Sequence, residues 1–149
     1  MIKIALDMMG GDNAPLSNIN GAIDFLNKNQ GSVKIYMVGD EKKILHELDK
    51  NSNISQNSFE IVHTSQVVDS NDKPSKIIKR KPDSSMNKSI CLLKDNIVDG
   101  VVSSGNTGCL VSSSFFNLGT IKGVKRPALF TIIPSENGNF LLGDVGENP

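Results

Sequence analysis

The sequence predicts an α/β fold with a mostly parallel sheet and helices on both of its faces. Short apolar runs alternate along the chain with amphipathic segments, and glycines or polar turn residues separate them. Strands that alternate with helices require crossover connections, which are typical of parallel sheets. The composition agrees, because 38% of the 149 residues are hydrophobic and 21% are charged, a globular balance.

The first part of the chain repeats a strand, a turn and a helix. Apolar runs at 2–6, 33–38 and 59–63 predict three strands. Helical spacing between them predicts two helices, the first ending near Gly31 and the second capped at Gly39-Asp40. The predicted buried positions are Ile19, Ala22, Ile23 and Leu26 in the first helix and Ile44, Leu45 and Leu48 in the second.

The next part begins with a polar stretch at 64–82, which predicts a loop with a short helix around Ile77 and Ile78. A helix capped by Asp83, Ser84 or Ser85 follows. Residues 100–103 predict a fourth strand, 106–118 a helix closed by Gly119, and 128–133 and 140–142 two further strands. The helix capped at 83–85 has Met86, Ile90, Leu93 and Ile97 as its predicted buried positions.

The charge and the cysteines exclude several classes of protein. The net charge is zero, which argues against a general nucleic-acid binder. Cys91 and Cys109 lack the spacing of a disulfide framework or a zinc site. The opening residues reach Asp7 before a signal peptide or membrane span can form, so we expect a cytoplasmic protein. The sequence ends on a loop-like segment, 146–149, where an α/β fold would normally supply another helix.

Two glycine-containing segments follow predicted strands, at the sheet edge where α/β proteins bind ligands. In the first, Gly10 and Gly11 allow close approach of the backbone to an anion, while Asp12 is either a catalytic or ligand-orienting group or a turn residue and helix cap. The second segment is a candidate phosphate or oxyanion cradle at a helix start, although its asparagine or threonine could merely cap that helix. It consists of Ser103, Ser104, Gly105, Asn106, Thr107 and Gly108.

A basic run, Lys79, Arg80 and Lys81, is either a solvated face or a docking surface for an acidic partner. The two histidines, His46 and His63, have no partners at metal-site or catalytic-triad spacing.

Five motifs in order resemble the PlsX-type phosphate acyltransferases. They are Asp7 to Pro15 (D-x-MGGD-x-AP), Val38-Gly39-Asp40, Asp72 to Met86, Ser103 to Gly108 (S-x-GNTG) and Ile121 to Pro127. The resemblance covers the whole chain, with three departures from the family pattern: Asn13 replaces a histidine, Ser104 replaces an alanine, and the segment 142–149 differs. Asn13 removes a titrating group from the first motif.

The resemblance implies a Rossmann-like fold similar to the isocitrate and isopropylmalate dehydrogenases. Residues 1–149 would be the N-terminal part of one α/β phosphate acyltransferase domain whose C-terminal half is absent. It also implies a reaction of acyl-[acyl carrier protein] with inorganic phosphate that yields acyl phosphate for phospholipid synthesis, without a metal or other cofactor. The full-length protein would be a homodimer, with peripheral membrane association through the absent half.

The resemblance assigns roles to particular residues. Phosphate or oxyanion binding falls to the segment 103–108, with Asn106 as a candidate catalytic residue. Gly10, Gly11 and Asp12 would form the facing wall, with Asp12 the second catalytic candidate. Arg126 would balance charge, and Lys79, Arg80 and Lys81 would dock the carrier protein.

Two alternatives stay open. One is a nicotinamide-dependent decarboxylating dehydrogenase, whose paired metal-binding aspartates are not found in this half. The other is a non-catalytic truncated fragment. On either the acyltransferase or the fragment hypothesis, we expect this chain alone to be inactive.

Overall fold

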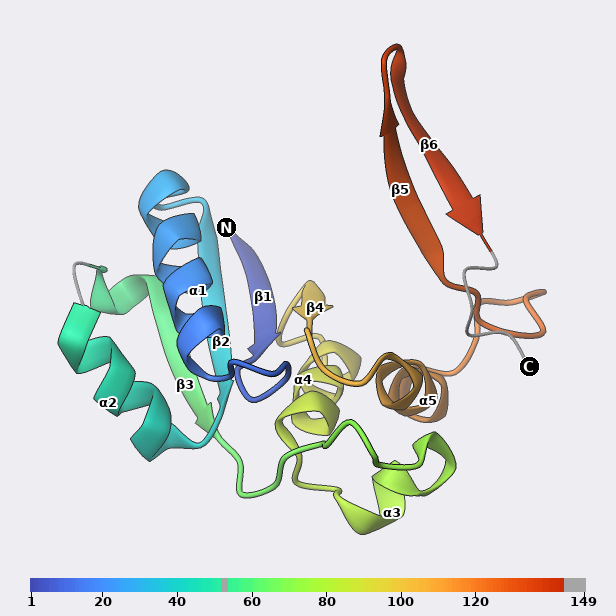
Figure 1. Ribbon diagram of the computed structural model, residues 1–149, viewed down its shortest axis with the longest axis horizontal. Helices are drawn as coiled ribbons and strands as arrows, with labels where there is room; N and C mark the ends of the chain where they lie inside the picture. The colour runs from blue at the N-terminus through green and yellow to red at the C-terminus, as the bar shows by residue number, and fades with distance from the viewer. Residues whose placement is uncertain (52–53, 144–149) are drawn as a thin grey trace. The chain divides into compact units, whose positions relative to one another are not determined.

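A parallel sheet of four strands, in the order β3-β2-β1-β4, organises the first of two units in this computed structural model, residues Met1–Leu118 (Figure 1). The structure describes residues 1–51 and 54–143. The strands of the sheet are β1 (Ile2–Asp7), β2 (Val33–Gly39), β3 (Phe59–His63) and β4 (Gly100–Val102). The helices of this unit are α1 (Leu16–Lys28), α2 (Glu41–Asn51), α3 (Ile77–Arg80), α4 (Ser85–Lys94) and α5 (Thr107–Leu118), with short 3-10 turns at Gln56–Ser58 and Pro74–Lys76.

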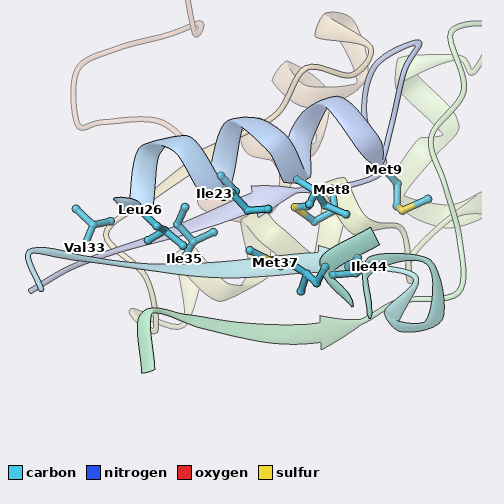
Figure 2. Packing of buried hydrophobic residues seen from close by; sticks show 11 residues of the cluster. Met8, Met9, Ile23, Leu26, Val33, Ile35, Met37 and Ile44 are labelled. Atoms are coloured by element: carbon cyan, nitrogen blue, oxygen red, sulfur yellow. The ribbon is translucent and has the colours of Figure 1, made fainter. Parts of the chain in front are cut away.

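Helices cover both faces of the sheet, as predicted. Because neighbouring residues of a strand point to opposite faces, β2 contributes to two separate clusters. Ile35 and Met37 pack under α1 and α2, and Figure 2 shows them with Ile23 and Leu26 of α1. Tyr36 and Val38 pack on the opposite face, in a cluster that includes Leu92 of α4. The α/β fold class is therefore confirmed.

The predicted strands and helices are present with small shifts of their ends, but two predicted buried positions are wrong and a third is only partly buried. Leu45 is 42% exposed, because Ile44 and Leu48 occupy the side of α2 that faces the core. Ile97 is 40% exposed, since α4 ends at Lys94. Leu93 is only half-buried, and its neighbour Leu92 is the buried residue of that turn.

The second unit, Gly119–Pro149, contains an antiparallel hairpin of β5 (Phe130–Ser135) and β6 (Gly138–Gly143). Both strands were expected, and they pair with each other as a separate two-stranded sheet. The loop-like segment predicted at 146–149 lies outside the described residues. In the described ranges, no helix is both long enough and apolar enough to cross a membrane.

Candidate active site

The candidate site lies where the strand order of the sheet reverses. The chain builds outward from β1 to β2 and β3, then crosses back so that β4 pairs with the other side of β1. The loops that leave β1 and β4 therefore diverge from neighbouring strands at the carboxyl edge, which is where open α/β sheets bind ligands. These are the two glycine-containing segments that the sequence predicts as site loops.

The two loops touch through their backbones at Gly10 and Gly105. A Cβ atom added at Gly10 would lie 2.8 Å from the nitrogen of Gly105 and 2.7 Å from Oδ2 of Asp7. Gly11, the next residue, has a φ of 97° and faces Ser104, a backbone conformation that favours glycine. The glycines are thus needed for a close contact between two loops, in addition to any contact with a ligand.

Asp7 joins the two loops to α4 and was not predicted as a site residue. Its side chain is buried at 1% exposure. Oδ1 accepts hydrogen bonds from the hydroxyl of Ser85 at 2.6 Å and from the N–H of Met9 at 3.2 Å. Oδ2 accepts one from the hydroxyl of Ser103 at 2.7 Å. The available signal was a carboxylate at the end of an apolar strand immediately before a glycine loop.

Asn18 of α1 holds the first loop in place. Its Nδ2 donates to the carbonyl oxygens of Met8 at 3.0 Å and Gly10 at 2.8 Å. Its Oδ1 accepts a longer hydrogen bond, 3.4 Å, from the hydroxyl of Ser104. One helical side chain thereby contacts both loops, and sequence patterns alone gave no reason to select it.

A cleft of about 760 Å³ opens beside these loops. The loop after β1 and the start of α5 form two of its sides, and residues 67–72 form the third. Every residue that lines it belongs to the first unit: Met9, Gly11, Asp12, Val67, Val68, Asp69, Ser70, Asn71, Asp72, Ser104, Gly105, Asn106 and Thr107. The cleft therefore brings Asp12 together with most of the predicted 103–108 cradle.

Asn106 caps α5 and ties it to the third side of the cleft. Its Oδ1 accepts a hydrogen bond from the N–H of Cys109 at 3.0 Å, and its Nδ2 donates to the carbonyl oxygen of Ser70 at 3.0 Å. The first helical hydrogen bond of α5 runs from Leu110 to the Asn106 carbonyl. The N–H groups of Thr107 and Gly108 precede that bond, and such groups at a helix start are suited to an anion. A catalytic role for Asn106 stays a prediction.

Lys81 stabilises the third side of the cleft, residues 67–72, without lining the cleft itself. Its Nζ lies 2.6 Å from Oδ2 of Asp69 and 2.5 Å from Oδ2 of Asp72, and it donates to the Val67 carbonyl at 2.7 Å. Hydrogen bonds from Lys81 and from the N–H of Asp69 hold the pKa of Asp72 below its ordinary value of 3.8. Burial lowers the pKa of Lys81, but its bonds to the two carboxylates outweigh this and raise it above 10.5.

The structure divides the predicted docking residues. Lys79 and Arg80 are exposed in the last turn of α3, whereas Lys81 is half-buried in its two ion pairs. Arg126 lies in the second unit, so its predicted place at the site stays a prediction. His46 is exposed, and the Nδ1 of His63 accepts a hydrogen bond from the N–H of Glu41.

The chain belongs to the fatty acid synthesis protein family, whose model it matches over residues 2–149. Its relatives carry the name phosphate acyltransferase. It is 42% identical to the protein of Clostridium tetani over 147 residues, which is 99% of this chain and 43% of that protein. The corresponding identities are 41% over 148 residues for Clostridioides difficile and 43% over 153 residues for Staphylococcus aureus, again at 99% and 43% coverage. The chain thus spans less than half the length of these relatives.

Proposed function

We propose that this chain forms part of an acyltransferase that converts acyl-[acyl carrier protein] and inorganic phosphate into acyl phosphate and free carrier protein, in phospholipid biosynthesis. The name of its relatives, phosphate acyltransferase, supports the reaction class. The observation that carries the proposal at residue level is the cleft at the strand-order reversal, where the start of α5 and a glycine loop offer backbone N–H groups. Because those relatives share one name, the acyltransferase hypothesis is favoured over the dehydrogenase alternative.

The proposed reaction requires little covalent chemistry from the protein itself. A phosphate oxygen attacks the thioester carbonyl carbon, a tetrahedral oxyanion forms, and the C–S bond then breaks. Sulfur leaves as the thiol of the carrier protein, and its proton is the one that the P–OH group of phosphate gives up. The protein must hold phosphate beside the carbonyl and stabilise the oxyanion, so positioning and electrostatics supply the catalysis. We assign phosphate or oxyanion binding to the segment 103–108, with the N–H groups of Thr107 and Gly108 as donors.

Charge is the main constraint on this assignment. The cleft is lined by three carboxylates, those of Asp12, Asp69 and Asp72, and its lining among the described residues includes no lysine or arginine. Lys81 offsets the charge of the last two from behind. The proposal therefore requires a cation from elsewhere, and Arg126 is our candidate. Asp12 would orient the phosphate by accepting a hydrogen bond from its P–OH group.

Acyl carrier protein is the proposed partner. Its acidic surface would meet Lys79 and Arg80, which are exposed beside the wall of the cleft that Lys81 supports. Such contacts mainly steer the encounter. A homodimer and peripheral membrane association of the full-length protein are further parts of the proposal, implied by the resemblance.

The test is an assay for acyl phosphate, trapped with hydroxylamine, using acyl carrier protein substrate and varied phosphate. We expect the full-length enzyme to require phosphate and the 149-residue chain to show no turnover. Replacing Gly108 by leucine in the full-length enzyme should raise the phosphate concentration for half-saturation roughly tenfold or more, because it changes a residue whose N–H group we assign as a phosphate donor. If phosphate saturation is unchanged while use of the acyl substrate falls, the loop serves the thioester instead.

A further inference from the structure

The buried carboxyl group of Asp7 does not itself line the cleft, yet it is hydrogen-bonded to Ser103 in the segment to which we assign phosphate. Burying a carboxyl group is costly unless it is hydrogen-bonded. The structure gives it two hydroxyl donors and one N–H donor, from three different segments of the chain. An apolar residue at this end of β1 would avoid the desolvation cost of a buried carboxyl group. We therefore expect the carboxyl group to have a role beyond filling space in the core.

Its two hydroxyl partners have different surroundings. Ser85 stands in the first turn of α4, is 1% exposed, and anchors one carboxylate oxygen to the helix. Ser103 follows β4 and is part of the proposed cradle. Asp7 thus connects the buried side of α4 to the loop that faces the cleft.

The hydroxyl of Ser103 links the Asp7 carboxyl group to the backbone N–H of Gly105. It donates to Asp7 at 2.7 Å and accepts from the N–H of Gly105 at 3.1 Å. A hydroxyl has one proton and two lone pairs, so committing the proton to Asp7 turns a lone pair toward Gly105. Without the carboxylate the hydroxyl is free to rotate, and the Gly105 amide loses a fixed acceptor.

Gly105 has little room to move while this contact is intact. A Cβ atom placed on it would lie 2.9 Å from Cε of Met86 and 3.4 Å from Cα of Gly10. The next residue, Asn106, caps α5. A shift of Gly105 therefore moves the start of α5, including the N–H groups of Thr107 and Gly108.

We infer that Asp7 is a positioning residue: through the hydroxyl of Ser103 it fixes the Gly105 amide and so shapes the anion-binding start of α5. This rests on the proposed function for the ligand, phosphate, but the order of the loop can be measured separately. A purely structural Asp7 would stabilise the fold without acting on this loop.

The experiment compares D7N, S103A and the double variant D7N/S103A in this chain. Binding of radiolabelled inorganic phosphate is measured by equilibrium dialysis, and amide exchange of residues 103–110 by mass spectrometry. Each single variant should weaken phosphate binding about tenfold, the scale of a lost charge-assisted hydrogen bond. The double variant should bind no more weakly than either single one, because both act through one contact. S103T, which keeps the hydroxyl, should stay within about threefold of the parent chain.

Ser89→Ala is the matched control. Ser89 is fully buried in α4 and donates its hydroxyl to the Ser85 carbonyl at 2.8 Å, so this variant also loses one buried hydrogen bond. It should change phosphate binding and loop exchange less than twofold.

The possible results separate an error in the relay through Ser103 from an error in the proposed ligand. Independent, multiplying effects of D7N and S103A on phosphate binding would overturn the relay through Ser103. Unchanged exchange of 103–110 in both single variants would also overturn it. If neither this chain nor the full-length enzyme binds phosphate, the proposed ligand is wrong; equal acceleration of loop exchange in D7N, S103A and the double variant would still support the positioning role. If D7N does not fold, S103A against S103T and S89A decides.

Discussion

Replacing Gly10 by alanine is the most direct test of the contact between the two site loops. The added Cβ would lie 2.7 Å from Oδ2 of Asp7 and 2.8 Å from the nitrogen of Gly105, against 3.4–4 Å for ordinary van der Waals contact. Neither atom is the end of a flexible side chain, because the first is held by Ser103 and the second is backbone. The loops must therefore separate or strain.

Overpacking of this kind costs about 1–3 kcal/mol of unfolding free energy. At about 2–4 °C per kcal/mol for a chain of this length, the unfolding temperature should fall by roughly 2–12 °C. Phosphate binding should weaken as well, since the start of α5 follows Gly105. Unfolding is followed by far-UV circular dichroism against temperature and urea.

Gly21→Ala is the matched control, because nothing lies within 4 Å of a Cβ atom placed there. Gly21 is inside α1, where alanine is favoured over glycine by about 0.5–1 kcal/mol. The two substitutions are chemically identical and should change stability in opposite directions. A G10A variant as stable as the parent chain would refute the close contact of the loops.

Two further predictions concern the basic run. Charge reversal in K79E/R80E should slow association of the full-length enzyme with acyl carrier protein at low salt and have less effect at high salt, as measured by stopped-flow binding. The same two-charge reversal at the exposed Lys42 and Lys43 of α2 should leave association unchanged, and an unaltered salt profile of K79E/R80E would indicate a merely solvated face. K81M should lower the free energy of unfolding by about 1–2 kcal/mol, measured by urea unfolding. The pKa of Asp72 is below 3.8, so its contribution is complete above that pH and lost as pH falls through the lowered value. The difference between K81M and the parent chain should therefore shrink only at more acidic pH, and a constant difference there would exclude the ion pair as its cause.

The basic run also shows why a local pattern was insufficient. Lys79, Arg80 and Lys81 are adjacent basic residues that the sequence does not distinguish. In the part of the chain that the structure describes, Lys81 alone of the three is shown in ion pairs, because the loop at 69–72 brings Asp69 and Asp72 next to it. Those carboxylates are 12 and 9 residues away along an irregular loop. No periodicity relates the positions in such a segment, so neither the ion pairs nor their lowered and raised pKa values could be predicted.

Asp7 was overlooked for a similar reason. In the sequence it is an acidic residue between a strand and a glycine turn, a common place for a solvated side chain. Its burial depends on Ser85 and Ser103, which are 78 and 96 residues away. Asp7 connects α4 to the cradle only because the fold places both serines beside the end of β1.

The sequence alone determined the α/β class, nearly all the elements, and the two glycine loops that follow β1 and β4, because strand and helix periodicity and turn chemistry depend on neighbouring residues. The tertiary structure decided that these two loops meet. Their contact requires β4 to return and pair beside β1 rather than beyond β3, and that choice depends on how the helices between them pack on the two faces of the sheet. Gly10 and Gly105 are 95 residues apart and touch only for that reason.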